Sequence, residues 1–421
     1  MATRQPSREP ITDKDRVLLR NLAKQVADIA ALPIQAERRQ WWKQHNSLKI
    51  RRPMLLVFPE GSWEELLPQS SLRCAGQRAR EIEWQLRSRI YYHDHLKDDT
   101  VIEKTWVVNK VIHHTGWGLE AQHIDSPEER GAWRFDPVIH SPDDMAQLRV
   151  PEVVYDAQAT RQALVEAQDL FGDILDVQLK GVTHISYHLM ALYTGWRGLE
   201  QVMMDMVLNP GWLHDAMAFL TEGHQQVLRQ YIDQNLLSLN NDQTYQSSGG
   251  NGYTDELPVP GFDPQRVRPR DMWASAEAQE MAGVSPAMHA EFILHYERQL
   301  LAPFGLTGYG CCEDLTHKLD DVFTLPNIRR ISISPFADVT ACAEKLRGNY
   351  IYSWKPNPAH LVGVFDEGRV RAHIEQAVAA CQAHGCVLEI VLKDTHTCEN
   401  RPERFDRWLA IAREVRQAFW D

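Results

Sequence analysis

The chain has 421 residues and a formal net charge of −12 at pH 7, with 43% hydrophobic and 24% charged residues. These proportions are typical of a globular protein, and the length allows one large core or two smaller ones. The acidic balance argues against nucleic acid or an anionic membrane surface as main partner, because both select for a basic face. The sequence has no apolar run of about 18 residues, which excludes a membrane span. Its polar N-terminus lacks a signal-peptide core, so we expect a cytoplasmic protein.

The first hundred or so residues contain helical periodicity and one buried strand. The spacing of apolar residues predicts helices over 14–31 and 34–45. A short apolar segment bounded by prolines, 51–58, is typical of a buried strand. A further helix is predicted over 78–96, and β-branched residues favour a strand or hairpin over 105–116.

From residue 175 onwards strands and helices alternate. The predicted strands are 175–181, 236–240, 305–309, 330–334, 350–353 and 387–393. The predicted helices are 198–208, 212–235, 286–301, 315–323, 339–346, 370–384 and 401–419. Such alternation is characteristic of a parallel sheet covered by helices.

The number of predicted strands defines the expected fold. Together with 51–58 and the middle strands they number about eight, which predicts an α/β fold of the (β/α)8 TIM-barrel type. The expected organisation is an N-terminal helical extension at 1–50 and a barrel at 51–421, with an insertion around 60–150. A doubly wound open sheet is the alternative.

Candidate functional residues follow from that fold, because catalytic groups in barrels sit after the carboxyl ends of strands. Polar and thiol groups stand at almost every predicted strand end. We assign Glu60, Asn240, Tyr309 and Lys355 to substrate binding, together with Trp273, which is expected near a loop where it would line a pocket. Three further polar residues, Glu313, His396 and Asp242, are the candidates for catalysis.

Two cysteine-containing clusters are the sharpest chemical signal. Six of the seven cysteines lie in the last third of the chain, and an odd number fits free thiols better than disulfides. The clusters are Cys311-Cys312-Glu313 and His396-Thr397-Cys398. Thiolates beside imidazole or carboxylate suit zinc, so Cys311, Cys312 and Cys398 are candidate ligands. The alternative is two unrelated thiols, one packed and one exposed.

Other motifs carry less weight. His184 and His188 lie four residues apart and are assigned a structural role. The sequence has no Walker A motif, no GxGxxG after a strand, no GxSxG and no HExxH. Their absence weakens nucleotide-hydrolase, dinucleotide, serine-hydrolase and zincin hypotheses.

Several of these segments resemble one known superfamily. They are Tyr309–Glu313, SISPFADV (332–339), NYIYSWKPNPAHL (349–361) and the late Cys398, with supporting matches at Arg197–Glu200 and Val284–Met288. Over roughly 150–421 the chain resembles the uroporphyrinogen decarboxylase-like superfamily, in particular its branch of cobalamin-dependent (zinc) methyltransferases. The resemblance implies a (β/α)8 barrel with its active site at the C-terminal mouth.

The resemblance also implies a ligand set. Zinc methyltransferases of this superfamily bind the metal through a His-x-Cys after one strand and a cysteine after the last strand. Cys398 matches the late cysteine, and Cys311 or Cys312 matches the first. Tyr309 and Gly310 stand where the histidine is expected. Three residues are available to complete the set, namely Glu313, Asp338 and His396.

The decarboxylase branch fits poorly. Its members bind substrate carboxylates through an arginine-rich loop after the first strand, whereas the loop here is the acidic 59–65 segment. Repulsion between carboxylates makes a polycarboxylate porphyrinogen an unsuitable substrate.

The leading hypothesis is therefore a zinc-assisted methyltransferase that moves a methyl group between a small methylated substrate and a corrinoid or thiol. The corrinoid would be carried on a partner protein. Glu313 and His396 would be further ligands or proton donors, and Asp242 would orient the substrate. The alternatives are a metal-free decarboxylase or lyase using Asp242, Lys355 and His396, and a non-catalytic barrel that binds a corrinoid or a partner. The N-terminal helices would form a lid, a plug or a homodimer contact.

Overall fold

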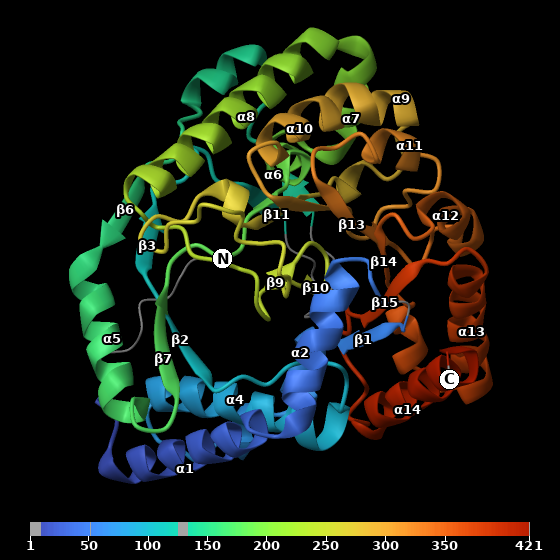
Figure 1. Cartoon of the computed structure of the whole chain (residues 1–421). Helices are drawn as coiled ribbons and strands as arrows, with labels where there is room; N and C mark the ends of the chain where they lie inside the picture. The colour runs from blue at the N-terminus through green and yellow to red at the C-terminus, as the bar shows by residue number, and fades with distance from the viewer. Residues whose placement is uncertain (1–9, 51, 125–133, 421) are drawn as a thin grey trace. The chain divides into compact units, whose positions relative to one another are not determined.

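The computed structural model describes residues 10–50, 52–124 and 134–420. Chain contacts divide it into two compact units (Figure 1). Unit 1 comprises 1–109, 158–180 and 354–421, and unit 2 comprises 110–157 and 181–353. Because each unit is assembled from segments distant in sequence, each is described by itself. The boundaries expected at residue 50 and around 60–150 stay predictions.

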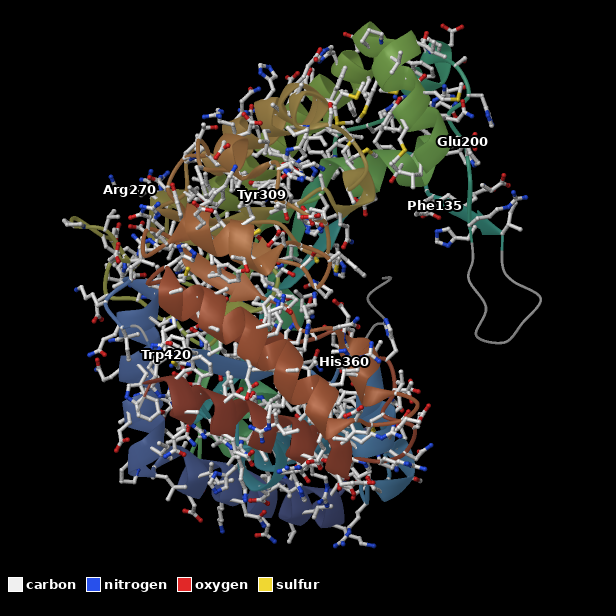
Figure 2. All side chains as sticks on the ribbon, turned by 90° about the vertical axis from the view of Figure 1, so that its right-hand side faces the viewer. Phe135, Glu200, Arg270, Tyr309, His360 and Trp420 are labelled. Carbon is white, nitrogen blue, oxygen red and sulfur yellow. The ribbon has the colours of Figure 1, made fainter. Side chains whose placement is uncertain are left out.

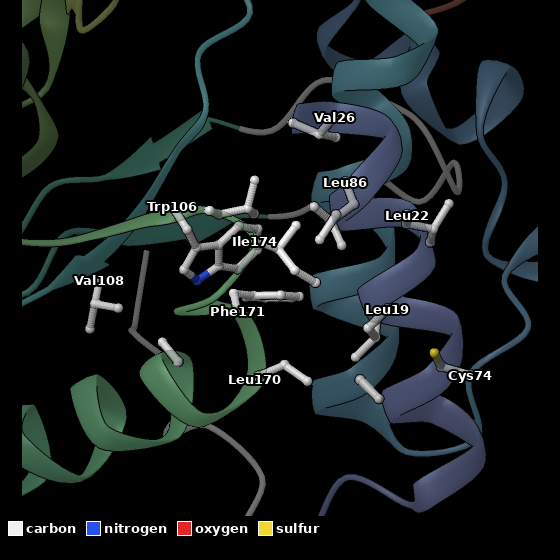
Figure 3. Packing of buried hydrophobic residues seen from close by; sticks show 14 of the residues in the cluster. Leu19, Leu22, Val26, Cys74, Leu86, Trp106, Val108, Leu170, Phe171 and Ile174 are labelled. Atoms are coloured by element: carbon white, nitrogen blue, oxygen red, sulfur yellow. The ribbon is translucent and has the colours of Figure 1, made fainter. Parts of the chain in front are cut away.

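The helical part of unit 1 is built around an apolar cluster. The helices are α1 (Asp13–Ala30), α2 (Pro33–Asn46), α3 (Trp63–Leu66), α4 (Gln77–Tyr91), α5 (Ala157–Phe171), α13 (Glu367–Ala383) and α14 (Glu403–Trp420). Helix α1 begins after Thr12, whose hydroxyl accepts a hydrogen bond from the Asp15 N–H at 3.1 Å, as N-cap residues do. Its buried face, with Leu19 and Leu22, packs with Leu86 of α4 and Phe171 of α5 (Figure 3).

Two pairs of parallel strands complete unit 1. Strand β2 (Thr105–Asn109) pairs with β7 (Asp176–Lys180), and β1 (Met54–Val57) pairs with β15 (Val387–Leu392). On its other side β1 meets two carboxylates: the Leu55 N–H donates to Asp99 at 2.8 Å and the Val57 N–H to Asp98 at 2.9 Å. These side chains take the place of a further strand beside β1. Helices α13 and α14 lie side by side in this unit (Figure 1).

Unit 2 contains a row of parallel strands in the order β8 (Ser186–Tyr187), β11 (Trp273–Ala276), β12 (Leu306–Tyr309) and β13 (Ile328–Ile333). Its helices are α6 (Leu189–Arg197), α7 (Leu199–Leu208), α8 (Pro210–Asp233), α9 (Pro286–His289), α10 (His295–Leu301), α11 (Leu319–Val322) and α12 (Val339–Leu346). Shorter antiparallel pairs are β3 (Val111–His114) with β6 (Val153–Asp156), β4 (Gln122–Ile124) with β5 (Arg134–Asp136), and β9 (Tyr245–Gln246) with β10 (Gly250–Asn251).

The α/β class is confirmed, because both units contain parallel strands and helices, and β14 (Ile351–Trp354) is a further buried strand. Closure of eight strands into a (β/α)8 barrel stays a prediction. Two strand assignments were wrong. Strand β11 falls where the sequence predicted none, and the segment 236–240 contributes only an isolated bridge from Leu237 to Val182. None of the described helices is long and apolar enough to cross a membrane.

Candidate functional site

The sequence-predicted residues fall into both units. Unit 2 contains Asn240, Asp242, Trp273, Tyr309, Cys311, Cys312 and Glu313, and unit 1 contains Glu60, Lys355, His396 and Cys398. In each unit several of them lie just after the carboxyl ends of parallel strands, as expected for catalytic groups in α/β proteins.

In unit 2 the loop after β12 folds back on its own carboxylate. Gly310 adopts a φ of +90°, which lets the chain turn sharply at the strand end. Glu313 then accepts hydrogen bonds from the Cys311 N–H at 2.8 Å and from the Ala278 N–H at 3.3 Å. Since Ala278 follows β11, the Glu313 side chain fastens the loops of two neighbouring strands together.

The two cysteines of this loop are adjacent in space as well as in sequence. Their sulfur atoms lie 3.6 Å apart, and the Ser248 hydroxyl donates to the Cys311 sulfur at 3.2 Å. Both cysteines are half-buried, so the thiols are neither sealed in the core nor fully exposed. A reactive thiol needs this combination of shelter and access.

Glu313 is poised to exchange a proton near neutral pH. Only 1% of the residue is exposed. Burial, followed by the charge of Glu277, raises the pKa of Glu313 to about 7. A carboxyl group with this pKa is present in both protonation states at physiological pH, which suits general acid–base catalysis.

A histidine–carboxylate pair stands at the ends of two neighbouring strands, β11 and β8. Glu277 follows β11 and accepts a short hydrogen bond from the Nδ1 of His188, which follows β8. The His188 Nε2 lies 2.8 Å from the Ser186 hydroxyl. Burial disfavours the imidazolium, but the hydrogen bond and charge of Glu277 outweigh it, and the pKa of His188 is raised. Because 45% of the His188 side chain is exposed, it can exchange protons with solvent.

Further carboxyl groups surround this pair. Burial raises the pKa of Glu280, and the charge of Glu277 raises it further. Glu297 of α10 is fully buried, and burial lifts its pKa well above the usual value. Ionisation of these groups is disfavoured, because clustered carboxylates in an apolar setting repel one another.

The predicted substrate-binding residues of unit 2 have mostly structural contacts. Tyr309 is fully buried, with its hydroxyl 2.9 Å from the His289 Nε2. Trp273 lies in β11 rather than in a loop, is 1% exposed, and donates through Nε1 to the Gly252 carbonyl at 3.0 Å. Asn240 donates to the Trp273 carbonyl at 2.9 Å and accepts from the Trp273 N–H at 3.0 Å.

This Asn240 pairing explains the wrong strand prediction at 236–240. Its side-chain amide satisfies the backbone of β11 where a neighbouring strand would have done so. Asp242, the predicted substrate-orienting carboxylate, is half-buried and accepts from the Thr244 N–H at 2.8 Å.

In unit 1 the ends of β1 and β15 bring Glu60 and His396 together. Glu60 and Asp394 both adopt positive φ angles, +46° and +58°, which non-glycine residues rarely do. A Cβ on Gly61 would lie only 2.9 Å from the His396 carbonyl oxygen, so the two loops are closely packed. Burial raises the pKa of Glu60, an effect opposed by the nearby Lys393.

Cys398 is bound to a carboxylate in unit 1. Its sulfur donates to Glu65 at 3.0 Å, and its N–H donates to the same oxygen at 3.0 Å. Burial and the Glu65 hydrogen bond raise the pKa of Cys398 to about 11, so this thiol stays protonated. Lys355 is also buried in this unit, with 2% of the residue exposed.

The thiols do not form a ready metal site in either unit. Within the described parts of the chain, no group of three or more His, Cys, Asp or Glu side chains is arranged to hold a metal ion. Cys311 and Cys312 supply two sulfur atoms at a spacing that one tetrahedral ion could bridge, but a zinc site needs four ligands or three and a water. Cys398 is engaged by Glu65. Zinc binding by Cys311, Cys312 and Cys398, which belong to different units, stays a prediction.

Sequence reasoning assigned His188 a structural role and missed Glu277 and Ser248. The positions of His188 and Glu277 could have identified them, since each directly follows a strand of the parallel row. These positions were overlooked because β8 is only two residues long and because β11 was not predicted.

No protein-family model and no curated protein matches the chain. Among solved structures, the chain is similar to a methyltransferase from Methanosarcina mazei, over 91% of this chain and 99% of that one, with 10% sequence identity and a TM-score of 0.46. A likeness this distant does not define a function, which has to be argued from the site itself.

Proposed function

We propose that the chain is a methyltransferase whose reaction takes place at the strand ends of unit 2. The substrate would be a small methylated compound, and the acceptor a thiol or a corrinoid carried on a partner protein. Two lines of support are independent: the sequence resemblance around Tyr309–Glu313, and the pairing of two thiols with acid–base groups. The observation that carries the proposal is Glu313, a carboxyl group with a pKa of about 7 hydrogen-bonded to the Cys311 N–H.

The chemistry of methyl transfer explains why these groups would be needed. When a methyl group leaves an oxygen, nitrogen or sulfur atom, that atom gains electron density and has to be protonated or otherwise stabilised. Glu313 in its protonated form is a suitable donor, and His188 beside Glu277 can return the proton from solvent. In the reverse direction, ionised Glu313 can remove the proton of an acceptor thiol, since thiolates rather than thiols attack methyl groups.

Zinc has no assigned step in this proposal, because the described side chains form no group of three potential metal ligands. The corrinoid enters only as a methyl carrier, and (β/α)8 closure is proposed on the basis of the sequence resemblance. Cys398 is proposed as a structural thiol of unit 1 rather than a metal ligand, because Glu65 holds it protonated.

The test is methyl transfer by the purified chain. Methylcobalamin would be offered with a series of small thiols, and cobalamin with small O-, N- and S-methyl compounds, with the corrinoid absorbance as readout. We expect turnover with at least one pair, lost in Glu313→Gln and kept in Glu344→Gln, a control at an exposed glutamate of α12. Turnover that survives Glu313→Gln would refute the assigned role.

Zinc analysis of the same preparations, including Cys312→Ala and Cys398→Ala, tests the metal: one zinc per chain lost in both variants would overturn the metal-free assignment.

A further inference from the structure

Unit 2 has a polar cavity formed by the segment that leads into β11, at the opposite end from the strand's carboxyl end. The cavity has a volume of about 480 Å³. It is lined by Ile232, Gly261, Asp263, Arg266, Arg268, Pro269, Arg270, Asp271 and Pro303. Because Trp273 is the first residue of β11 and Glu277 follows its last, the cavity and the pair of Glu277 and His188 stand at opposite ends of the same strand.

Three arginines place positive charge around this cavity. Arg266, Arg268 and Arg270 are all exposed, and Figure 2 shows Arg270 at the outer surface. Across the described residues, none of the three guanidinium groups forms a hydrogen bond or an ion pair with another side chain. Unpaired guanidinium groups gathered around one cavity are suited to binding an anion, since each can donate two parallel hydrogen bonds.

The backbone that carries Arg268 and Arg270 is held firmly. The Arg268 N–H donates to Asp271 at 3.1 Å, and the Asp271 N–H donates to the Arg268 carbonyl at 2.9 Å. On the other side, a Cβ on Gly305 would lie 2.2 Å from the Arg270 carbonyl oxygen, so the two chain segments are in close contact. A backbone fixed in this way holds in place the positions from which the Arg268 and Arg270 side chains extend.

Two carboxylates line the cavity: Asp271 is buried and accepts the Arg268 N–H, and the other, Asp263, narrows the class of ligand. Asp263 is exposed, and its carboxylate accepts the Gln265 N–H at 2.9 Å, with no ion pair to the arginines among the described residues. A bare anion would be repelled by Asp263, whereas a ligand that also carries a hydroxyl group could donate a hydrogen bond to it.

From these observations we propose that the cavity binds the phosphate group of a small hydroxylated phosphate monoester. The arginines hold the phosphate oxygens, and Asp263 accepts a hydrogen bond from the ligand's hydroxyl. The three guanidinium groups outnumber the two carboxylates that line the cavity, Asp263 and Asp271, and this excess of positive charge favours an anionic ligand. This site is independent of the proposed methyl transfer.

The test is calorimetric titration of the full-length protein with inorganic phosphate, glycerol phosphate and uncharged glycerol. We expect saturable binding of both phosphates, tighter for glycerol phosphate, and none of glycerol. Removing two guanidinium groups in Arg268→Gln/Arg270→Gln should weaken phosphate binding at least tenfold, because charge-assisted hydrogen bonds are lost. The matched control is Arg161→Gln, at an exposed arginine of α5, which should bind as the wild type does.

The Asp263→Asn variant tests the proposed hydroxyl contact separately from the phosphate contact. It should tighten binding of inorganic phosphate, because a repelling charge is removed, and it should reduce the preference for glycerol phosphate. Melting temperatures of all variants confirm that they are folded. Absence of phosphate binding in the wild type, or equal binding in wild type and the double arginine variant, would overturn the site. An unchanged ligand preference in Asp263→Asn would overturn the assignment of the hydroxyl contact.

Discussion

The two units use a carboxylate beside a cysteine in opposite ways. In unit 1 Glu65 accepts hydrogen bonds from the Cys398 thiol and from backbone N–H groups. Burial opposes its ionisation, but these bonds outweigh it and lower the pKa of Glu65 to about 2. In unit 2 Glu313 also accepts backbone N–H groups, yet burial and Glu277 raise its pKa to about 7. The same pair of residue types is therefore structural in one place and titratable in the other, and the surroundings decide which.

The largest expected difference between Glu313 and Glu65 is in catalysis. Glu313→Gln should lower kcat/KM for methyl transfer by about 10²–10³-fold, the usual contribution of a general acid–base group. Glu65→Gln should leave the rate of folded enzyme nearly unchanged. If both variants lose activity equally while still folded, the distinction between the two carboxylates is wrong.

The pH dependence of stability sharpens the comparison. Since the folded-state pKa of Glu313 is raised from 4.5 to about 7, its stabilising contribution is complete below pH 4.5 and is lost as the pH rises through 7. The expected loss is up to about 3 kcal/mol of unfolding free energy, because each tenfold change in acidity corresponds to about 1.4 kcal/mol. Urea denaturation between pH 5 and 8 measures it. The slope should flatten in Glu313→Gln, and an unchanged slope would contradict the raised pKa.

Glu65 has the reverse dependence. Its folded-state pKa is lowered, so its stabilising contribution is present above pH 4.5 and is lost as the pH falls towards 2. Glu65→Gln at neutral pH should cost about 2 kcal/mol, because charge-assisted hydrogen bonds to the Cys398 loop are lost. Denaturant unfolding compared with Glu64→Gln, at the exposed neighbouring residue, isolates the effect. Equal stability of the two variants would show that Glu65 does not hold the loop.

The smallest expected difference is in thiol reactivity. Cys311 and Cys312 should be alkylated by iodoacetamide at least about tenfold faster than Cys398, since reactivity follows exposure and thiolate content. Cys398 is fully buried, with a pKa of about 11. Mass spectrometry of peptides after timed alkylation gives the rates. Faster modification of Cys398 would reverse the assignment of the structural thiol.

Sequence periodicity located the strands that have clear boundaries. The segments 51–58 and 387–393 correspond to β1 and β15, because prolines or apolar runs mark them. Strand β11 escaped prediction because its sequence, WASA, is short and lacks β-branched residues. The 236–240 prediction failed because the side chain of Asn240 replaces the pairing of a strand, which depends on tertiary contacts.

The candidate site was partly predictable, because some of its residues follow a strand that the sequence reveals. Glu313 and the adjacent thiols were found because they immediately follow a correctly predicted strand. The pairing of His188 with Glu277 was not, because it joins residues 89 positions apart through a strand that the sequence did not reveal. Burial also decided which predicted residues can reach a ligand, and Tyr309 and Trp273 face inwards.

The central claim is that Glu313 exchanges a proton near neutral pH, and infrared difference spectroscopy of its carboxyl group tests it most directly. Spectra of the wild type and of Glu313→Gln would be recorded across pH 5 to 9. The account predicts a protonated-carboxyl band that disappears with a midpoint near pH 7 and is missing from the variant. A wild-type carboxyl signal identical to that of Glu313→Gln over this range would contradict the account and leave unit 2 without its proton donor.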